Sequence, residues 1–142
     1  MVLVAHYDSK AFCKWRTEKE GRTVRLPNEL EWEKAARGED GRLYPYGDEF
    51  DKKKCNTEES GIGRTTRVTR YPQSRSPCDV HDMAGNVWEW TDSFYDDDKD
   101  SYALRGGSWD DLRGVARCAY CDRGNPDFRS VAIGFRCVRT SK

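Results

Sequence analysis

Long apolar runs and an excess of charge of either sign are absent from this sequence. No segment approaches the roughly 20 consecutive apolar residues of a membrane-spanning helix, and only 36% of the 142 residues are hydrophobic. Lys plus Arg and Asp plus Glu both total 25, whereas nucleic acids and anionic membranes select basic surfaces. The sequence therefore predicts neither a membrane nor a nucleic acid as partner.

A secretory signal and a second cysteine pair are also lacking. The opening MVLVA is short and has no basic residue, which predicts a cytoplasmic location, or a part of a larger or phage-encoded protein. Six cysteines are present, but only Cys118 and Cys121 form a C-x-x-C. A structural zinc site usually needs a second such pair, and a thioredoxin-like site needs a βαβ context. Reduced thiols are favoured by the missing signal.

Two helices are predicted near the N-terminus. In DSKAFCKWRTEKEG, Asp8 is the expected N-cap and Gly21 the expected C-terminal stop. In RLPNELEWEKAARG, Asn28 and Glu31 have the spacing of a capping box, and Gly38 ends the helix.

After residue 38 the helical periodicity stops. Segments rich in Gly, Pro, Asn and Asp alternate with NVWEWT, YALRGGSW and AIGFRCV, which have the pattern of short strands. We expect one domain over residues 1–142 with an α+β fold: two helices, short antiparallel strands and long ordered loops.

Four motifs occur in a fixed order: RLPNELEWEKAARG at 25–38, YPYGDEF at 44–50, DMAGNVWEW at 82–90, and RGGSW…GFR between 105 and 136. Together they resemble the formylglycine-generating-enzyme, or sulfatase-modifying-factor, family. The resemblance implies a C-type-lectin-like fold. Domains of that family usually have a further N-terminal portion, so this chain resembles a shortened version.

The resemblance also bears on single residues. Gly106 and Gly107 allow a backbone path closed to other residues, beneath which Trp109 can pack, and Arg136 is expected to anchor a loop. In relatives the cysteines that match Cys13 and Cys137 form a disulfide. A buried pair of free thiols is the alternative.

DMAGNVWEW is similar to a stretch that binds Ca²⁺ in family members. Asp82 and Glu89 would provide carboxylates, and Gly85 and Val87 would provide carbonyl oxygens. Alternatively, Asp82 and Asn86 cap a tight turn and Glu89 pairs with an arginine.

Catalysis is not expected. The family oxidase holds copper with two cysteines shortly after the Gly-Gly-Ser-Trp motif, but residues 110–116 contain none, and Cys118 resembles a structural cysteine. A related branch binds iron through a histidine cluster, whereas this chain has only His6 and His81. We therefore expect neither copper nor iron.

Residues 110–132 contain no Lys, Glu, Gln, Met or Trp, although the other 119 residues contain 27 of them. An NNC codon cannot encode these five types. Diversity-generating retroelements produce such codons from AAC in C-type-lectin-like proteins, and the frame RGGSW…ARCAY…IGFRC is similar to those variable proteins. The predicted ligand-binding residues are Asp110, Asp111, Leu112, Gly114, Val115, Tyr120, Cys121, Asp122, Gly124, Asn125, Asp127, Phe128, Ser130, Val131 and Ala132.

A macromolecular ligand is expected at this surface, and a protein is favoured over a glycan because no sugar-binding calcium motif is present. Aromatic and apolar side chains would anchor the partner, and an acidic rim would favour its Arg or Lys residues. The anchors are Leu112, Tyr120 and Phe128, and the rim is Asp110, Asp111, Asp122 and Asp127. An ordinary, non-diversified binding or regulatory domain of the same family is the alternative, and an oxidase is a distant one.

Overall fold

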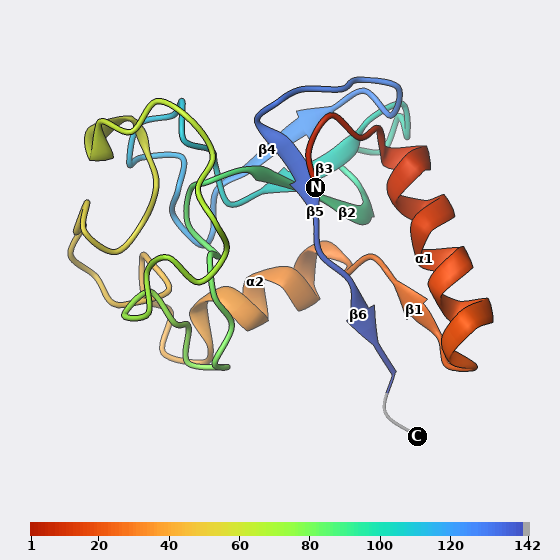
Figure 1. Ribbon diagram of the computed structural model, residues 1–142, viewed down its shortest axis with the longest axis horizontal. Coiled ribbons are helices and arrows are strands. Elements are labelled where there is room, and N and C mark those ends of the chain that lie inside the picture. The colour runs from red at the N-terminus through yellow and green to blue at the C-terminus, as the bar shows by residue number, and fades with distance from the viewer. Residues whose placement is uncertain (141–142) are drawn as a thin grey trace.

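The computed structural model describes residues 1–140, which form two helices, a 3₁₀ turn and six strands (Figure 1). The elements are α1 (His6–Glu20), β1 (Val24–Arg25), α2 (Glu29–Arg37), η1 (Glu58–Ser60), β2 (Trp88–Phe94), β3 (Tyr102–Arg105), β4 (Cys121–Gly124), β5 (Ile133–Phe135) and β6 (Val138–Arg139). The predicted α+β class is confirmed. None of the helices in residues 1–140 is long and apolar enough to cross a membrane.

The central sheet has the strand order β4-β3-β2-β5, and β1 pairs with β6 in a separate ribbon. All pairs are antiparallel except β2 with β5, which is parallel. The expectation of only antiparallel strands is therefore wrong at one pair. β4 and β5 lie at opposite edges of the central sheet. Residues 125–132 cross from β4 to β5, and β5 then runs beside β2 in the same direction as β2 (Figure 1).

The segment AIGFRCV, expected to form one strand, forms two short strands that belong to different sheets. β5 ends at Phe135, and β6 begins at Val138 and pairs with β1. β1 and β4 were not predicted from the sequence. β1 has only two residues, and the CDRG of β4 has no β-branched or aromatic side chain to mark it.

Helix α2 has the predicted ends, whereas α1 begins earlier than expected. The Asn28 side chain accepts from the Glu31 N–H at 2.8 Å, and Glu31 accepts from the Asn28 N–H at 2.9 Å. In α1 the N-cap is Ala5, and Asp8 is the third residue, where its carboxylate accepts from the Ala5 N–H at 2.8 Å. The prediction that Asp8 is the N-cap was wrong, because Asp8 lies inside the first turn and its carboxylate reaches back to the N–H of the N-cap residue Ala5.

The Gly106–Gly107 path is confirmed, because both glycines have positive φ, 97° and 70°. A Cβ on Gly106 would lie 3.1 Å from the ring of Trp32, so α2 contacts this turn. The packing of Trp109 beneath the turn stays a prediction.

A fully buried histidine lies where α1 meets the sheet. His6 stacks on Tyr102 with ring centroids 3.5 Å apart and contacts Trp90 edge-on. Its Nε2 donates to the Thr91 carbonyl at 3.0 Å, and its Nδ1 has no partner within residues 1–140. Burial lowers the pKa of His6, and the Thr91 carbonyl offsets part of this effect.

We expect this histidine to make stability depend on pH. In the unfolded chain it takes up a proton near its ordinary pKa of about 6.5, before the folded chain does. The stabilisation is complete above that pH and is lost as the pH falls toward the folded pKa. Lowering the pH from about 7.5 to about 5.5 should reduce the Tm of the protein more than that of His6→Gln, which keeps an amide donor but does not titrate. Equal losses in calorimetry would contradict this assignment.

Candidate ligand-binding face

Most residues predicted to bind a ligand lie in two loops, 106–120 between β3 and β4 and 125–132 between β4 and β5, and Cys121, Asp122 and Gly124 lie in β4 itself (Figure 1). The side chains exposed there are Asp110, Leu112, Tyr120, Asp122, Asn125, Asp127, Phe128 and Val131. Residues of the interleaved frame, by contrast, are buried at Ala116, Cys118, Ile133 and Gly134. Exposed predicted positions thus lie among buried frame positions, and Arg117 and Ala119 of the frame are exposed as well.

The two loops meet at a cavity of about 260 Å³ over the central sheet. Its apolar lining comes from Trp88, Leu104, Phe128, Ala132 and Ile133, and its polar lining from Ser108, Asp110, Asp111, Asp122, Arg123 and Ser130. The structure therefore brings together six of the predicted residues: Asp110, Asp111, Asp122, Phe128, Ser130 and Ala132.

Trp88 connects this cavity to the sheet. Its Nε1 donates to the Asp111 carboxylate at 2.8 Å, and its ring lies 6.0 Å from that of Tyr120. Asp111 also accepts from the N–H and hydroxyl of Ser108. Asp111 therefore holds the loop in shape, whereas the Asp110 carboxylate has no hydrogen-bond partner within residues 1–140 and is available to a ligand.

Some predicted site residues belong to the scaffold instead. Gly124 is buried, and a Cβ there would lie 2.4 Å from the Trp90 ring. Val115 packs against the core, and Cys121 lies half-buried in β4. Gly124 as a ligand contact was wrong, because only a glycine fits against Trp90.

The 125–132 loop is held by the segment that leads into α1, beside which it runs in Figure 1. The His6 N–H donates to the Pro126 carbonyl at 3.0 Å, and the Leu3 N–H donates to the Ser130 carbonyl at 3.0 Å. Arg129 donates through Nε to Asp8, also at 3.0 Å. Residues 3–8 thus support one half of the face.

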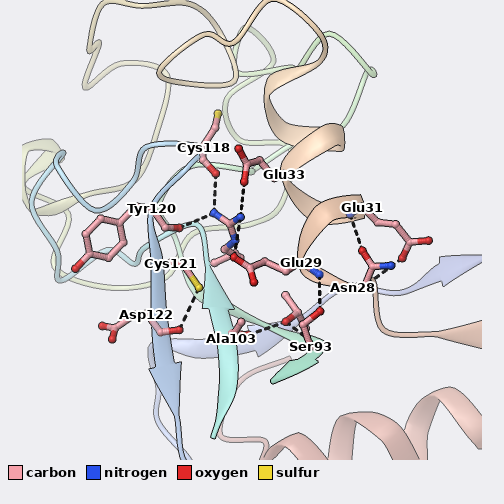
Figure 2. Close-up of polar contacts among 12 residues, drawn as sticks. Asn28, Glu29, Glu31, Glu33, Ser93, Ala103, Cys118, Tyr120, Cys121 and Asp122 are labelled. Carbon is pink, nitrogen blue, oxygen red and sulfur yellow. Dashed lines mark hydrogen bonds and ion pairs between the residues drawn. The ribbon is translucent and has the colours of Figure 1, made fainter. Parts of the chain in front are cut away.

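The 106–120 loop is held by the fully buried Arg105. Its Nη1 donates to the carbonyls of Cys118 and Tyr120 at 3.0 and 2.9 Å. Its Nη2 forms ion pairs with Glu33 at 2.6 Å and Glu29 at 3.1 Å, both on α2. Figure 2 shows Glu29 and Glu33 of α2 close to Cys118 and Tyr120 of the loop. The sequence placed Arg105 in the frame but did not reveal its burial, because its partners are distant along the chain.

The four residues proposed as calcium ligands line another cavity, of about 480 Å³, and the carboxylates of two of them have protein partners. Glu89 accepts from Arg136 Nε and Nη2 at 2.5 and 2.7 Å, and from Trp32 Nε1 at 2.6 Å. Asp82 accepts from the Thr69 N–H at 2.9 Å. A guanidinium already neutralises Glu89, as in the alternative raised from the sequence.

Arg136 anchors the loop before β2, as predicted. Besides Glu89, its Nη2 contacts the carbonyls of His81 and Asp82, both at 3.2 Å. Asn86, at φ 71°, accepts from the Thr66 N–H at 2.9 Å, so its side chain links this turn to the loop that contains Thr66.

All six cysteines are thiols in the structure. Cys13 and Cys137 have their Sγ atoms 3.5 Å apart, well beyond the roughly 2.0 Å of a disulfide bond, so the disulfide stays a prediction. Burial raises the pKa of both Cys118 and Cys121 to about 12, which keeps them protonated at neutral pH. No cluster of three or more His, Cys, Asp or Glu residues suited to a metal occurs in residues 1–140.

Curated relatives are similar over nearly the whole chain. Inactive C-alpha-formylglycine-generating enzyme 2 of Bos taurus is 38% identical over 97% of this chain and 49% of that protein. Serine/threonine-protein kinase pkn1 of Chlamydia caviae is 36% identical over 100% and 24%. The formylglycine-generating enzyme of Streptomyces coelicolor is 31% identical over 97% and 52%. The chain thus spans about half or less of the length of these relatives.

Solved structures share the fold. Treponema denticola variable protein 1 superposes with a TM-score of 0.90 at 19% identity, covering 96% of this chain and 69% of that one. The Major Tropism Determinant U1 variant gives 0.65 at 15% identity, covering 92% and 36%. The predicted fold, that of C-type-lectin-like and formylglycine-generating-enzyme-like domains, is confirmed.

The family resemblance seen in the four motifs is confirmed as well. Residues 1–141 match the family described as "Sulfatase-modifying factor enzyme 1-like domain". The chain therefore belongs to the family of sulfatase-modifying factor enzyme 1-like domains.

Proposed function

We propose that this protein is a non-catalytic module that binds a macromolecular ligand through the loops 106–120 and 125–132. The observation that carries the proposal is the arrangement of exposed and buried positions along residues 105–137. Eight of the fifteen predicted ligand-binding side chains are exposed, six of the fifteen line one cavity, and buried frame residues such as Ala116 and Cys118 lie between them. Such an arrangement lets a binding surface change while its support stays rigid.

A protein is the favoured ligand. The cavity of about 260 Å³ has room for one protruding side chain of a partner. Three carboxylates and one guanidinium line it, which favours a Lys or Arg and disfavours phosphates. Phe128 would pack against the aliphatic part of that side chain.

The cysteines support a non-catalytic role. A copper-dependent oxidase of this family needs a thiolate pair after the Gly-Gly-Ser-Trp motif, and residues 110–116 have no cysteine. Protonated, buried Cys118 is a poor substitute. One relative is named an inactive formylglycine-generating enzyme, although another is named as the active enzyme.

Diversification by a retroelement is the origin we propose for the variable positions. The support is the missing Lys, Glu, Gln, Met and Trp in residues 110–132, together with a fold shared with two proteins whose names describe variation. An ordinary family domain with a fixed ligand is the alternative.

Sequencing the genomic locus separates these two origins. We expect a reverse-transcriptase gene and an adenine-rich near-repeat of the segment that encodes residues 110–132. If neither lies near the gene, the retroelement origin is wrong, and the binding role is left to be judged by its own experiment.

That experiment is a pair of displayed libraries selected against one model protein antigen. The first randomises exposed positions Asp110, Leu112, Asp122, Phe128 and Val131 with NNC codons. The second randomises five buried frame positions, Trp88, Leu104, Arg105, Cys118 and Ile133. We expect folded binders from the first library and loss of folding in the second, because buried substitutions leave cavities or unpaired charge. A first library that folds but gives no binders after repeated selection would argue against a binding face.

For calcium, we expect no effect. The protein treated with a chelator and then given CaCl₂ should show no heat in calorimetry and no change in Tm, because Arg136 already pairs with Glu89. As a control, Arg136→Gln removes the guanidinium and should be less stable. A calcium-dependent rise in Tm of the unmodified protein would overturn this expectation.

A further inference from the structure

A second cavity adjoins the ligand-binding face and is lined by three arginines. It has a volume of about 280 Å³. One wall is formed by the C-terminal end of α2 and the turn after it, and the other wall by the loop 106–120. Its lining residues are Arg37, Arg42, Leu43, Gly114, Arg117, Ala119 and Tyr120. No carboxylate is among them, in contrast to the cavity beside Phe128.

The two guanidinium groups on the α2 side are held in place. Arg37 donates through Nη1 to Glu33 at 2.7 Å and through Nη2 to the Gly41 carbonyl at 2.5 Å. Its Nε is buried and has no partner within residues 1–140. Arg42 is held in turn by the Asp40 carboxylate.

The opposite wall supplies the uncompensated charge. Arg117 is exposed and has neither an ion pair nor a hydrogen bond from its side chain within residues 1–140. Arg42 is balanced by Asp40, and the pair Arg37 and Arg105 is balanced by Glu29 and Glu33. The Asp48 carboxylate also lies at the α2 side, where it accepts from the Leu43 N–H at 2.9 Å, so the arginine left for an anion is Arg117 on the opposite wall.

The remaining lining is apolar and fixed in position. Leu43 and Tyr120 present apolar surface, and the Cys118 N–H donates to the Leu43 carbonyl at 2.8 Å, which joins the two walls. Arg105 fixes the Tyr120 carbonyl from below. A ligand would thus meet donors at one end and apolar side chains at the other.

We infer that this cavity binds a carboxylate carried on a small apolar group. The arginines would hold the carboxylate by charge-assisted hydrogen bonds, and Leu43 and Tyr120 would cover the apolar group. The carboxylate could belong to a free organic acid or to the C-terminal residue of a peptide. This site shares Gly114 and Tyr120 with the predicted ligand-binding residues, and Arg117 and Ala119 lie in the same loop, but the site does not depend on that function.

The test is an NMR titration of ¹⁵N-labelled protein with matched acid and amide probes. The free acid is 3-phenylpropionate, compared with 3-phenylpropionamide. The peptide is Ala-Ala-Leu with a free C-terminus, compared with the same peptide amidated. We expect both acids to shift the amide resonances of Gly114, Ala119 and Tyr120, and the amides to have no effect. A stronger response to the peptide acid would assign the site to chain termini, and a stronger response to 3-phenylpropionate to free acids.

Arg117→Gln should weaken acid binding by about tenfold, because it removes a hydrogen bond between charged groups. Arg113→Gln is the matched control, since the Arg113 guanidinium lies over the Phe50 ring, outside the cavity. Arg117 has no structural contact to lose, so Arg117→Gln should keep the Tm of the parent. The inference is overturned if the amides bind as well as the acids, if neither acid binds, or if both variants weaken binding equally.

Discussion

The arrangement of this domain depends on one buried charge. Arg105 ends β3, and its guanidinium reaches two carboxylates on α2 and two carbonyls of the loop 106–120. Removing a guanidinium from water costs several kcal/mol unless its donors are paired. The helix, the sheet and the loop must therefore occupy positions that satisfy it together. Its distance of 5.7 Å from the Trp32 ring adds a further contact with α2.

The other buried polar contacts that hold the loops also join segments that are distant in sequence. Arg136 pairs with Glu89 and fixes the turn before β2, and residues 3–8 hold the loop 125–132 through backbone hydrogen bonds. Little regular secondary structure is needed, because the loops are fixed by buried polar contacts at their ends. The exposed side chains in the middle of the loops make few contacts that hold the fold. Such side chains can be replaced while the fold is kept.

Local features could be predicted from the sequence, and long-range partners could not. The ends of α2 were correct because Asn28, Glu31 and Gly38 act within one turn. The Asp8 cap was misplaced by three residues, since the same carboxylate can serve either position. The parallel pairing of β5, the contact of Trp32 with Gly106 and the burial of Arg105 depend on residues far apart in the chain. In the candidate site, the missing residue types of the segment 110–132 pointed to the exposed positions. The sequence could not separate these from scaffold positions such as Gly124 and Asp111, because glycine and aspartate occur in both roles.

The contact between Gly124 and Trp90 limits how many folded variants a diversified gene for this protein could encode. Gly124 lies inside the segment whose composition suggests variation, yet any side chain there would overlap the Trp90 ring. A process that altered every codon from 110 to 132 would leave most altered copies at this position unfolded, whatever their remaining residues. The usable repertoire is therefore smaller than the number of encoded sequences, and it is set by the packing of one tryptophan beneath the surface.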